Sequence, residues 1–100
     1  MPLRDRSWRL TNKTVADLQE IWRYTGGRWS AAQADDYHSD IMDMIGDLAA
    51  ERKRGRQIHV DDKSYLYRPC GSHNIFFREE KTRIVVVRIL HNRMDPARHL

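Results

Sequence analysis

Two amphipathic helical segments joined by a short connection constrain the fold of this chain more than any other feature of its sequence. Apolar residues recur at helical spacing over residues 14–25 and again over residues 30–52. Capping-box patterns begin both segments, at Thr14-x-x-Asp17 and at Ser30-x-x-Gln33. Gly26 and Gly27 lie between them and predict the end of the first helix, because glycine reaches the left-handed conformation of a C-cap without steric cost. So short a connection predicts an antiparallel helical hairpin with its apolar stripes in contact.

Strand-like segments lie on both sides of this hairpin. Residues 7–11 alternate loosely between apolar and polar and predict a short edge strand. After the hairpin, residues 52–63 (RKRGRQIHVDDK) show neither a helical nor a strand period, and we expect a basic connecting loop there. Three further strands are predicted at residues 64–68, 73–78 and 82–90. The short turns between them are typical of an antiparallel meander.

The order of these elements predicts an α+β fold. It consists of an N-terminal edge strand, an antiparallel helical hairpin and then a three-stranded antiparallel meander, with the hairpin on one face of the sheet. At 100 residues the chain has the size of one domain, and we expect residues 1–100 to form it. A domain this small has a modest core, so a deep, enclosed cofactor pocket is not expected.

Several features bear on where the chain acts. The longest apolar run covers residues 84–87, whereas a membrane span needs about 18 apolar residues. Charges interleave the first ten residues, which lack the apolar segment of a secretory signal. Cys70 is the only cysteine, so no internal disulfide can form. We therefore expect a cytoplasmic protein with no membrane partner.

Charge is distributed unevenly along the chain. Residues 1–50 carry 6 Lys/Arg against 8 Asp/Glu, whereas residues 51–100 carry 12 against 6. A basic half can face nucleic acid, a nucleoprotein enzyme or an acidic protein that neutralises it. The basic run at residues 52–56 could contact phosphates or an acidic partner. Arg52 and Lys53 also have a structural explanation, because they lie at the C-terminus of the predicted second helix, where positive charge interacts favourably with the helix dipole.

The sequence contains no convincing metal-binding or nucleophilic pattern. His91, Asp95 and His99 recur every four residues, but Pro96 interrupts the helix that would align them as metal ligands. Cys70 lies in a predicted turn with no evident base beside it, which is more typical of a small hydrophobe than of a nucleophile. A glycine-rich phosphate loop is missing as well. We therefore expect no metal, no cofactor and no catalytic residue.

RNA cleavage by general acid–base chemistry is the more serious enzymatic alternative. It requires cations around the scissile phosphate and a group that moves a proton. The candidates are Arg78, Arg88, His91 and Arg93. If the last two strands pair as a hairpin, Arg78 lies near the turn while Arg88 and His91 lie at the opposite end, so these cations are dispersed. Ordinary positions on a sheet surface explain such arginines more simply.

Four patterns, in the same order, resemble the ParE toxins of bacterial type II toxin–antitoxin modules. They are Asp17-Leu18-x-x-Ile21-Trp22-x-Tyr24-Thr25, Arg28-Trp29-Ser30-x-x-Gln33-Ala34-x-x-Tyr37, Gly71-Ser72-His73-x-Ile75-Phe76-Phe77-Arg78 and Arg88-Ile89-Leu90-His91-x-Arg93-Met94-Asp95-Pro96. The resemblance spans residues 7–100, departs from the family pattern over residues 50–63, and implies the RelE/ParE fold. It implies a toxin that inhibits DNA gyrase without being an enzyme. A ParD-like antitoxin would hold it inactive in a hetero-oligomer, and promoter DNA would be contacted only through that antitoxin.

Candidate binding residues follow from this resemblance and from the expected fold. Sheet edges can accept an added strand and grooves beside a helical hairpin can accept an amphipathic helix, while the basic half would suit an acidic antitoxin segment. The predicted antitoxin contacts are Leu18, Trp22, Tyr37, Arg78 and Arg88. The predicted target contacts, at the sheet end and in the tail, are Arg88, His91, Arg93 and Asp95. A structural alternative is that Arg93 and Asp95 cap and tie down the tail.

The related RelE toxins provide the alternative function. They share this fold but cut messenger RNA on the ribosome, using a cluster of basic residues and an aromatic or acid–base group near the sheet. This chain has no clear copy of that cluster, and its tail has no tyrosine. The resemblance therefore favours the ParE branch, and a ribosome-dependent endoribonuclease stays open as the second hypothesis.

Overall fold

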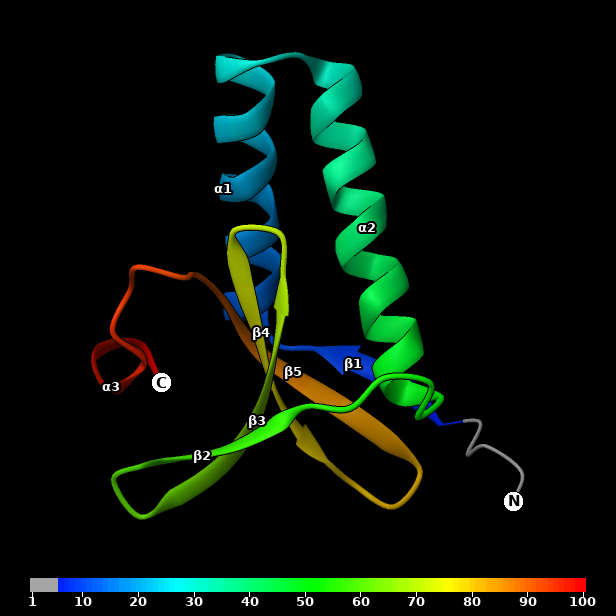
Figure 1. The fold of residues 1–100 in the computed structure, drawn as a ribbon, viewed down its shortest axis with the longest axis vertical. Coiled ribbons are helices and arrows are strands. Elements are labelled where there is room, and N and C mark those ends of the chain that lie inside the picture. The colour runs from blue at the N-terminus through cyan, green and yellow to red at the C-terminus, as the bar shows by residue number, and fades with distance from the viewer. Residues whose placement is uncertain (1–5) are drawn as a thin grey trace.

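A five-stranded sheet with a helical hairpin on one face forms the architecture of residues 6–100, the part of the chain that this computed structural model describes (Figure 1). The strands are β1 (Ser7–Leu10), β2 (Arg56–Val60), β3 (Lys63–Cys70), β4 (His73–Glu79) and β5 (Arg83–His91). Their spatial order is β1-β5-β4-β3-β2, with β1 parallel to β5 at one edge and the other pairs antiparallel. The expected α+β class, edge strand and helical hairpin are confirmed.

The first helix of the hairpin is longer than predicted at both ends. The helices are α1 (Asn12–Arg28), α2 (Ala31–Ala49) and a short α3 (Pro96–His99) in the tail. Thr11 is the N-cap of α1, because its hydroxyl accepts a hydrogen bond from the backbone N–H of Thr14 at 3.1 Å. The prediction that Gly26 and Gly27 end this helix is wrong. Neither glycine takes a positive φ, and the cost of about 1 kcal/mol for each glycine inside a helix does not interrupt the winding.

The second helix begins as predicted and ends earlier. Ser30 is its N-cap, with its hydroxyl accepting a first-turn backbone N–H at 3.0 Å. The helix ends at Ala49 because Glu51 takes a left-handed φ of 61°. Arg6 donates hydrogen bonds to the carbonyls of Leu48 and Ala49, at 3.2 and 3.0 Å, and so satisfies groups that the helix end leaves free. None of the helices within residues 6–100 is long and apolar enough to cross a membrane.

Strand β2 lies where the sequence indicated only a connecting loop, so the meander has four strands instead of three. Asp61 takes a left-handed φ of 55° in the turn between β2 and β3, and Ile58 pairs with Tyr65 across that hairpin. Only Ile58 and Val60 alternate in this strand, and the surrounding charges hide so short a period. Gly55 precedes the strand; a Cβ at this position would lie 2.8 Å from the Phe77 ring, so only glycine fits.

The hydrophobic core lies between the hairpin and the sheet. Helix α2 contributes the fully buried Ile41, Ile45 and Leu48. The strands contribute Cys70, Ile75, Phe77, Ile84, Val86 and Ile89. Burying a side chain of the larger aliphatic or aromatic kind contributes about 1.5–3 kcal/mol. This packing holds the hairpin against the sheet and places α1 against β5.

Candidate functional site

A groove of about 960 Å³ lies between the two helices, the sheet end and the tail. Its helical residues recur at helical spacing and are Asp17, Glu20, Ile21, Tyr24, Thr25 and Arg28 of α1 and Gln33, Asp36, Tyr37 and Asp40 of α2. The β3–β4 turn, the strands and the tail contribute Ser72, His73, Arg88, Ile89, Leu90, His91, Met94 and His99. Tyr24, Trp29 and Met94 line the groove and stay 64%, 67% and 47% exposed. The groove therefore presents free aromatic and apolar area.

Acidic side chains outnumber lysines and arginines along this groove. Within residues 6–100, four carboxylates line it against two arginines, Arg28 and Arg88. Arg88 is already paired with Asp17, which leaves Asp36 and Asp40 along α2 to dominate that wall. These carboxylates all come from residues 17–40, so the expectation that an acidic antitoxin segment suits the basic half of the chain stays a prediction. A segment that carries apolar and basic side chains is complementary to this groove.

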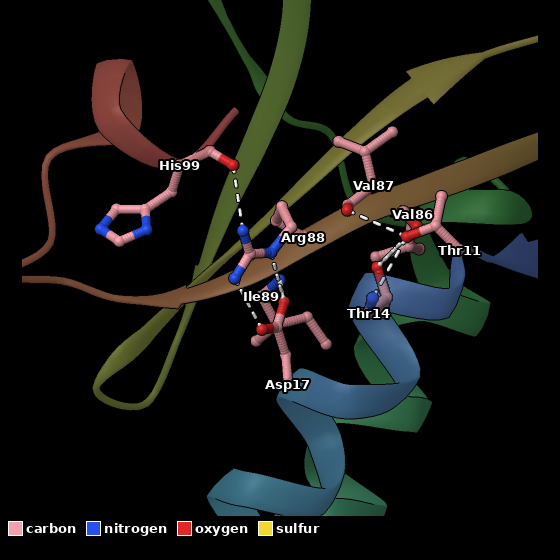
Figure 2. Close-up of polar contacts among 8 residues, drawn as sticks. All are labelled: Thr11, Thr14, Asp17, Val86, Val87, Arg88, Ile89 and His99. Carbon is pink, nitrogen blue, oxygen red and sulfur yellow. Dashed lines mark hydrogen bonds and ion pairs between the residues drawn. The ribbon is translucent and has the colours of Figure 1, made fainter.

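Arg88 ties α1, β5 and the tail together (Figure 2). Its Nε and Nη2 donate to the two carboxylate oxygens of Asp17, each at 2.8 Å, and its Nη1 donates to the carbonyl of His99 at 3.0 Å. Asp17 also accepts the backbone N–H of Ile89 at 2.9 Å. The hydrogen bond to Asp17 raises the pKa of Arg88 above its usual value. Arg88 is thus permanently charged, and hydrogen bonds within the protein hold its side chain in place.

Two threonines attach the start of α1 to the same strand (Figure 2). The buried Thr14 hydroxyl donates to the carbonyl of Val86 at 2.8 Å, and the Thr11 hydroxyl donates to the carbonyl of Val87 at 3.0 Å. We call Thr11, Thr14, Asp17 and Arg88 the α1–β5 junction. Thr14 therefore serves this junction rather than the helix cap that the sequence indicated. The junction fixes the side of α1 that lines the groove.

Tyr37 holds the β3–β4 turn against α2. Its hydroxyl lies 2.6 Å from His73 Nδ1 and 3.2 Å from the carbonyl of Cys70, and it accepts the backbone N–H of Ser72 at 3.0 Å. Gly71 makes this approach possible, because its φ is +58° and a Cβ there would lie 2.5 Å from the Tyr37 ring. Burial raises the pKa of Tyr37 above its ordinary value.

Two histidines face each other at the sheet end. His73 pairs with His91 across β4 and β5, and their ring centroids lie 5.3 Å apart. Burial, followed by the nearby His91, lowers the pKa of His73 below its ordinary value, while Asp17 acts in the opposite direction. His73 is therefore biased toward its neutral form, and its Nδ1 lies within hydrogen-bond distance of the Tyr37 hydroxyl.

The predicted antitoxin contacts separate into four environments. Leu18 is buried in the core, with 7% of its surface exposed, and offers almost no area to a partner. Trp22 is 39% exposed and donates from its indole N–H to Asp35 across the hairpin at 2.9 Å. Tyr37 and Arg88 line the groove. Arg78 lies outside the groove, in a second cavity on the sheet.

The predicted target contacts lie at the sheet end and along the tail. Arg88 and His91 line the groove, whereas Arg93 and Asp95 are exposed beside it. Asp95 is the N-cap of α3 and accepts the backbone N–H of Ala97 at 3.0 Å, which is the structural role considered as the alternative. Arg93 donates its backbone N–H to His91 Nδ1 at 3.2 Å. A contact of any of these residues with a target stays a prediction.

The prediction that the candidate RNA-cleaving cations lie apart is only partly correct. These cations are Arg78, Arg88, His91 and Arg93. Arg88 pairs with Phe76, two positions before Arg78 on the neighbouring strand, and both arginines line the second cavity, of about 580 Å³. A bulge between Phe76 and Phe77 shifts the register, which sequence periodicity does not reveal. His91 and Arg93 do not line this cavity.

The tail histidines and the lone cysteine are the residues that the sequence raised for metal binding and nucleophilic chemistry. Within residues 6–100, no three His, Cys, Asp or Glu side chains are grouped as a metal ion would require. Cys70 ends β3 instead of lying in a turn, and it is buried. Burial raises the pKa of its thiol, which disfavours the reactive thiolate.

The sequence interpretation missed Asp17 as a member of the site, although it belongs to the first resemblance pattern. Asp17, Ile21 and Tyr24 recur at positions i, i+4 and i+7, so they share one face of α1. That helical spacing was the signal from which the sequence could have placed Asp17 in the site. The tail residue Met94 gave no comparable signal, because only the folded tail brings it to the groove.

Relatives and a family model agree on one assignment. The model described as "ParE toxin of type II toxin-antitoxin system, parDE" matches residues 8–96. A Caulobacter vibrioides protein named Toxin ParE1 is 32% identical over 95 residues, covering 95% of this chain and 98% of that protein. A Mycobacterium tuberculosis protein, also named Toxin ParE1, is 38% identical over 92 residues, covering 91% and 94% respectively.

Solved structures share the fold at lower sequence identity. A chain from "Chromosomal ParDE TA system from P. aeruginosa" matches with a TM-score of 0.73 and 22% identity, covering 87% of this chain and 96% of that one. A chain from the toxin–antitoxin complex RelBE2 of Mycobacterium tuberculosis matches with a TM-score of 0.59 and 20% identity, covering 92% and 100%. These two likenesses establish the fold. With the family model and the sequence relatives, they lead to one conclusion: the chain belongs to the ParE toxin family of type II toxin–antitoxin systems.

Proposed function

We propose that this ParE toxin inhibits DNA gyrase by binding, without an enzymatic step, and that a ParD-like antitoxin neutralises it in the cytoplasm. The observation that carries the proposal is the match of the ParE family model to residues 8–96. The likeness to a RelBE2 chain concerns a fold that both toxin branches share, so it does not favour RNA cleavage. Promoter DNA is reached only through the antitoxin.

The groove is the site that we assign to the antitoxin. Exposed Tyr24 and Trp29 provide the aromatic area that is frequent among interface anchors. An amphipathic helix laid into a hydrophobic groove is a common docking mode, and the space between α1 and α2 suits it. Because Asp36 and Asp40 line the α2 wall, the docking helix should place Lys or Arg beside them.

Neutralisation then follows from overlap of the two binding surfaces. Arg88 and His91, which we assign to the target surface, also line the groove. Arg93 and Asp95 continue the target surface along the tail. An antitoxin segment in the groove would cover part of this surface, so antitoxin and gyrase compete for the toxin.

A matched pair of tryptophan variants tests the antitoxin site. Trp29→Ser removes a groove side chain, whereas Trp8→Ser removes a tryptophan of β1 that is 43% exposed and does not line the groove. Against a ParD-like antitoxin co-expressed with the toxin, we expect Trp29→Ser to weaken binding by about tenfold or more, and Trp8→Ser by about twofold or less. Equal affinities for the two variants would place the antitoxin elsewhere.

A supercoiling assay with purified gyrase tests the target. The wild-type toxin should inhibit supercoiling, and the antitoxin should relieve the inhibition. His91→Ala with Arg93→Ala should require about tenfold more toxin, because two contacts of the proposed surface are lost. His38→Ala with Arg23→Ala removes the same side chains from exposed helix positions outside the groove and should act like wild type. Full inhibition by the His91/Arg93 variant would remove these residues from the target surface.

A further inference from the structure

A second cavity, of about 580 Å³, lies on the sheet beside the α1–β5 junction. Four elements contribute cations to it: Lys13 from α1, Lys63 from β3, Arg78 from β4 and Arg88 from β5. His99 and Leu100 of the tail also line it, and Tyr65 adds a half-buried aromatic ring. We call this the cationic cavity. Residues this far apart in the sequence meet here only because the chain folds.

Three of the four cations have no carboxylate partner in the described chain. The ion pairs formed within residues 6–100 leave Lys13, Lys63 and Arg78 without an acidic oxygen within 4.0 Å. Arg88 is the exception, since it pairs with Asp17. Asp61 and Asp62 precede Lys63 in the β2–β3 turn, but neither of them lines the cavity. Like charges held near one another attract an anion.

We propose that the cationic cavity binds the phosphate of a nucleotide, either free or within a single nucleic-acid strand. Arg78 offers a planar guanidinium that can bind phosphate with two hydrogen bonds, and the two lysines supply compact positive charges. Tyr65 offers an aromatic face of the kind on which a base stacks. The cavity volume lies within the range of small-ligand sites, about 300–1,000 Å³.

This site is independent of the proposed antitoxin groove. Of residues 6–100, only Arg88 and His99 line both, and neither belongs to the three cations without a carboxylate partner there. The proposal therefore stands or falls separately from gyrase inhibition and antitoxin docking. It assigns binding and no catalytic step.

The test measures binding of two fluorescent probes, deoxyadenosine monophosphate and a short single-stranded oligonucleotide, to the full chain. Lys13→Gln with Lys63→Gln removes two exposed cations of the cavity and should weaken binding about tenfold or more. Lys53→Gln with Lys81→Gln removes the same charge from exposed positions outside the cavity, and should change binding about twofold or less. Arg78→Gln provides an independent second variant with the same expectation as the first.

Each outcome decides the proposal. Binding of the mononucleotide identifies a free nucleotide as a sufficient ligand, whereas binding of the oligonucleotide alone identifies the strand; both support the site. Equal weakening by the cavity and control variants would show diffuse charge attraction and overturn it. Competition by a short oligoglutamate peptide as effective as that by the oligonucleotide would also overturn it, because the cavity would then select charge without recognising a nucleotide. No binding of either probe would reject it outright.

Discussion

Arg88 and Arg78 occupy neighbouring strands and look alike in the sequence, yet their surroundings differ completely. The Arg88 side chain is 19% exposed and is held by Asp17 and the carbonyl of His99. Arg78 is exposed and, within residues 6–100, forms no ion pair. The difference arises because Asp17 of α1 lies within hydrogen-bond distance of Arg88. A cation with internal partners supports the fold, whereas one without them is available to a ligand.

The same contrast separates the α1–β5 junction from the cationic cavity. In the junction, each side chain donates to or accepts from a partner in the chain. In the cavity, three cations converge, and none of them has a carboxylate partner within residues 6–100. Substitutions in the first region should therefore change the free energy of unfolding, and substitutions in the second should change binding.

The largest effect is expected for Asp17→Ala. This change leaves Arg88 and the Ile89 N–H without their acceptor at a nearly buried site, and should lower the free energy of unfolding by about 3 kcal/mol. Urea denaturation measures it. Arg78→Ala is the control and should cost about 0.5 kcal/mol or less. If the two variants proved equally stable, the contrast between the two arginines would be wrong.

Tyr37→Phe is expected to have a smaller effect. It removes the hydroxyl that bonds to Ser72, His73 and Cys70 while it keeps the ring, and should cost about 1–2 kcal/mol. Thermal unfolding followed by circular dichroism measures the loss. Tyr24→Phe, at a highly exposed tyrosine on α1, serves as the matched control. A cost no greater than that of the control would show that the Tyr37 hydroxyl does not hold the turn.

Thr14→Val should destabilise the fold by about 1 kcal/mol, because it removes one buried hydrogen bond and keeps the side-chain volume. The Val86 carbonyl still accepts the backbone N–H of Thr11 at 3.1 Å, so it is not left without a donor. Urea denaturation again gives the difference. A cost of several kcal/mol would mean that the threonine does more than attach α1 to β5.

The smallest expected effect is a pH dependence from His73. Its pKa is lowered in the folded chain, so the unfolded chain binds the proton first as the pH falls. Its stabilising contribution is therefore complete above an ordinary histidine pKa of about 6.5 and is lost progressively as the pH falls below it. Tyr37, His91 and Asp17 are the titratable groups near it.

Urea denaturation at about pH 7.5 and about pH 5.5 measures this dependence. His73→Gln should lose less stability between the two pH values than His38→Gln, which alters an exposed histidine on α2 and keeps His73. Identical losses in both variants would contradict the assignment to His73.

Local patterns were sufficient for most of the fold. The N-cap at Ser30 is confirmed, because its hydroxyl accepts the backbone N–H of Gln33 within one turn of helix. The N-cap of α1 was misplaced because Thr11 and Thr14 are equally good caps by type, and only the contact of Thr14 with β5 decides between them. Strand β2 was missed because its pairing with β3, more than its own composition, stabilises it.

The candidate site was less predictable than the fold. Arg88 was identified as important, but its role depends on Asp17, which lies 71 positions away in the sequence. Leu18 and Trp22 belong to one helical pattern, yet packing buries the first and exposes the second. The cationic cavity requires a strand bulge and a folded tail, neither of which has a sequence period.

Pulse labelling of DNA and protein synthesis, immediately after the toxin is induced in bacteria without antitoxin, tests the proposed function most directly. Gyrase inhibition predicts that DNA synthesis stops first, with filamentation and a DNA-damage response while translation continues. Collapse of protein synthesis within the first minutes would contradict it and favour a ribosome-dependent endoribonuclease instead.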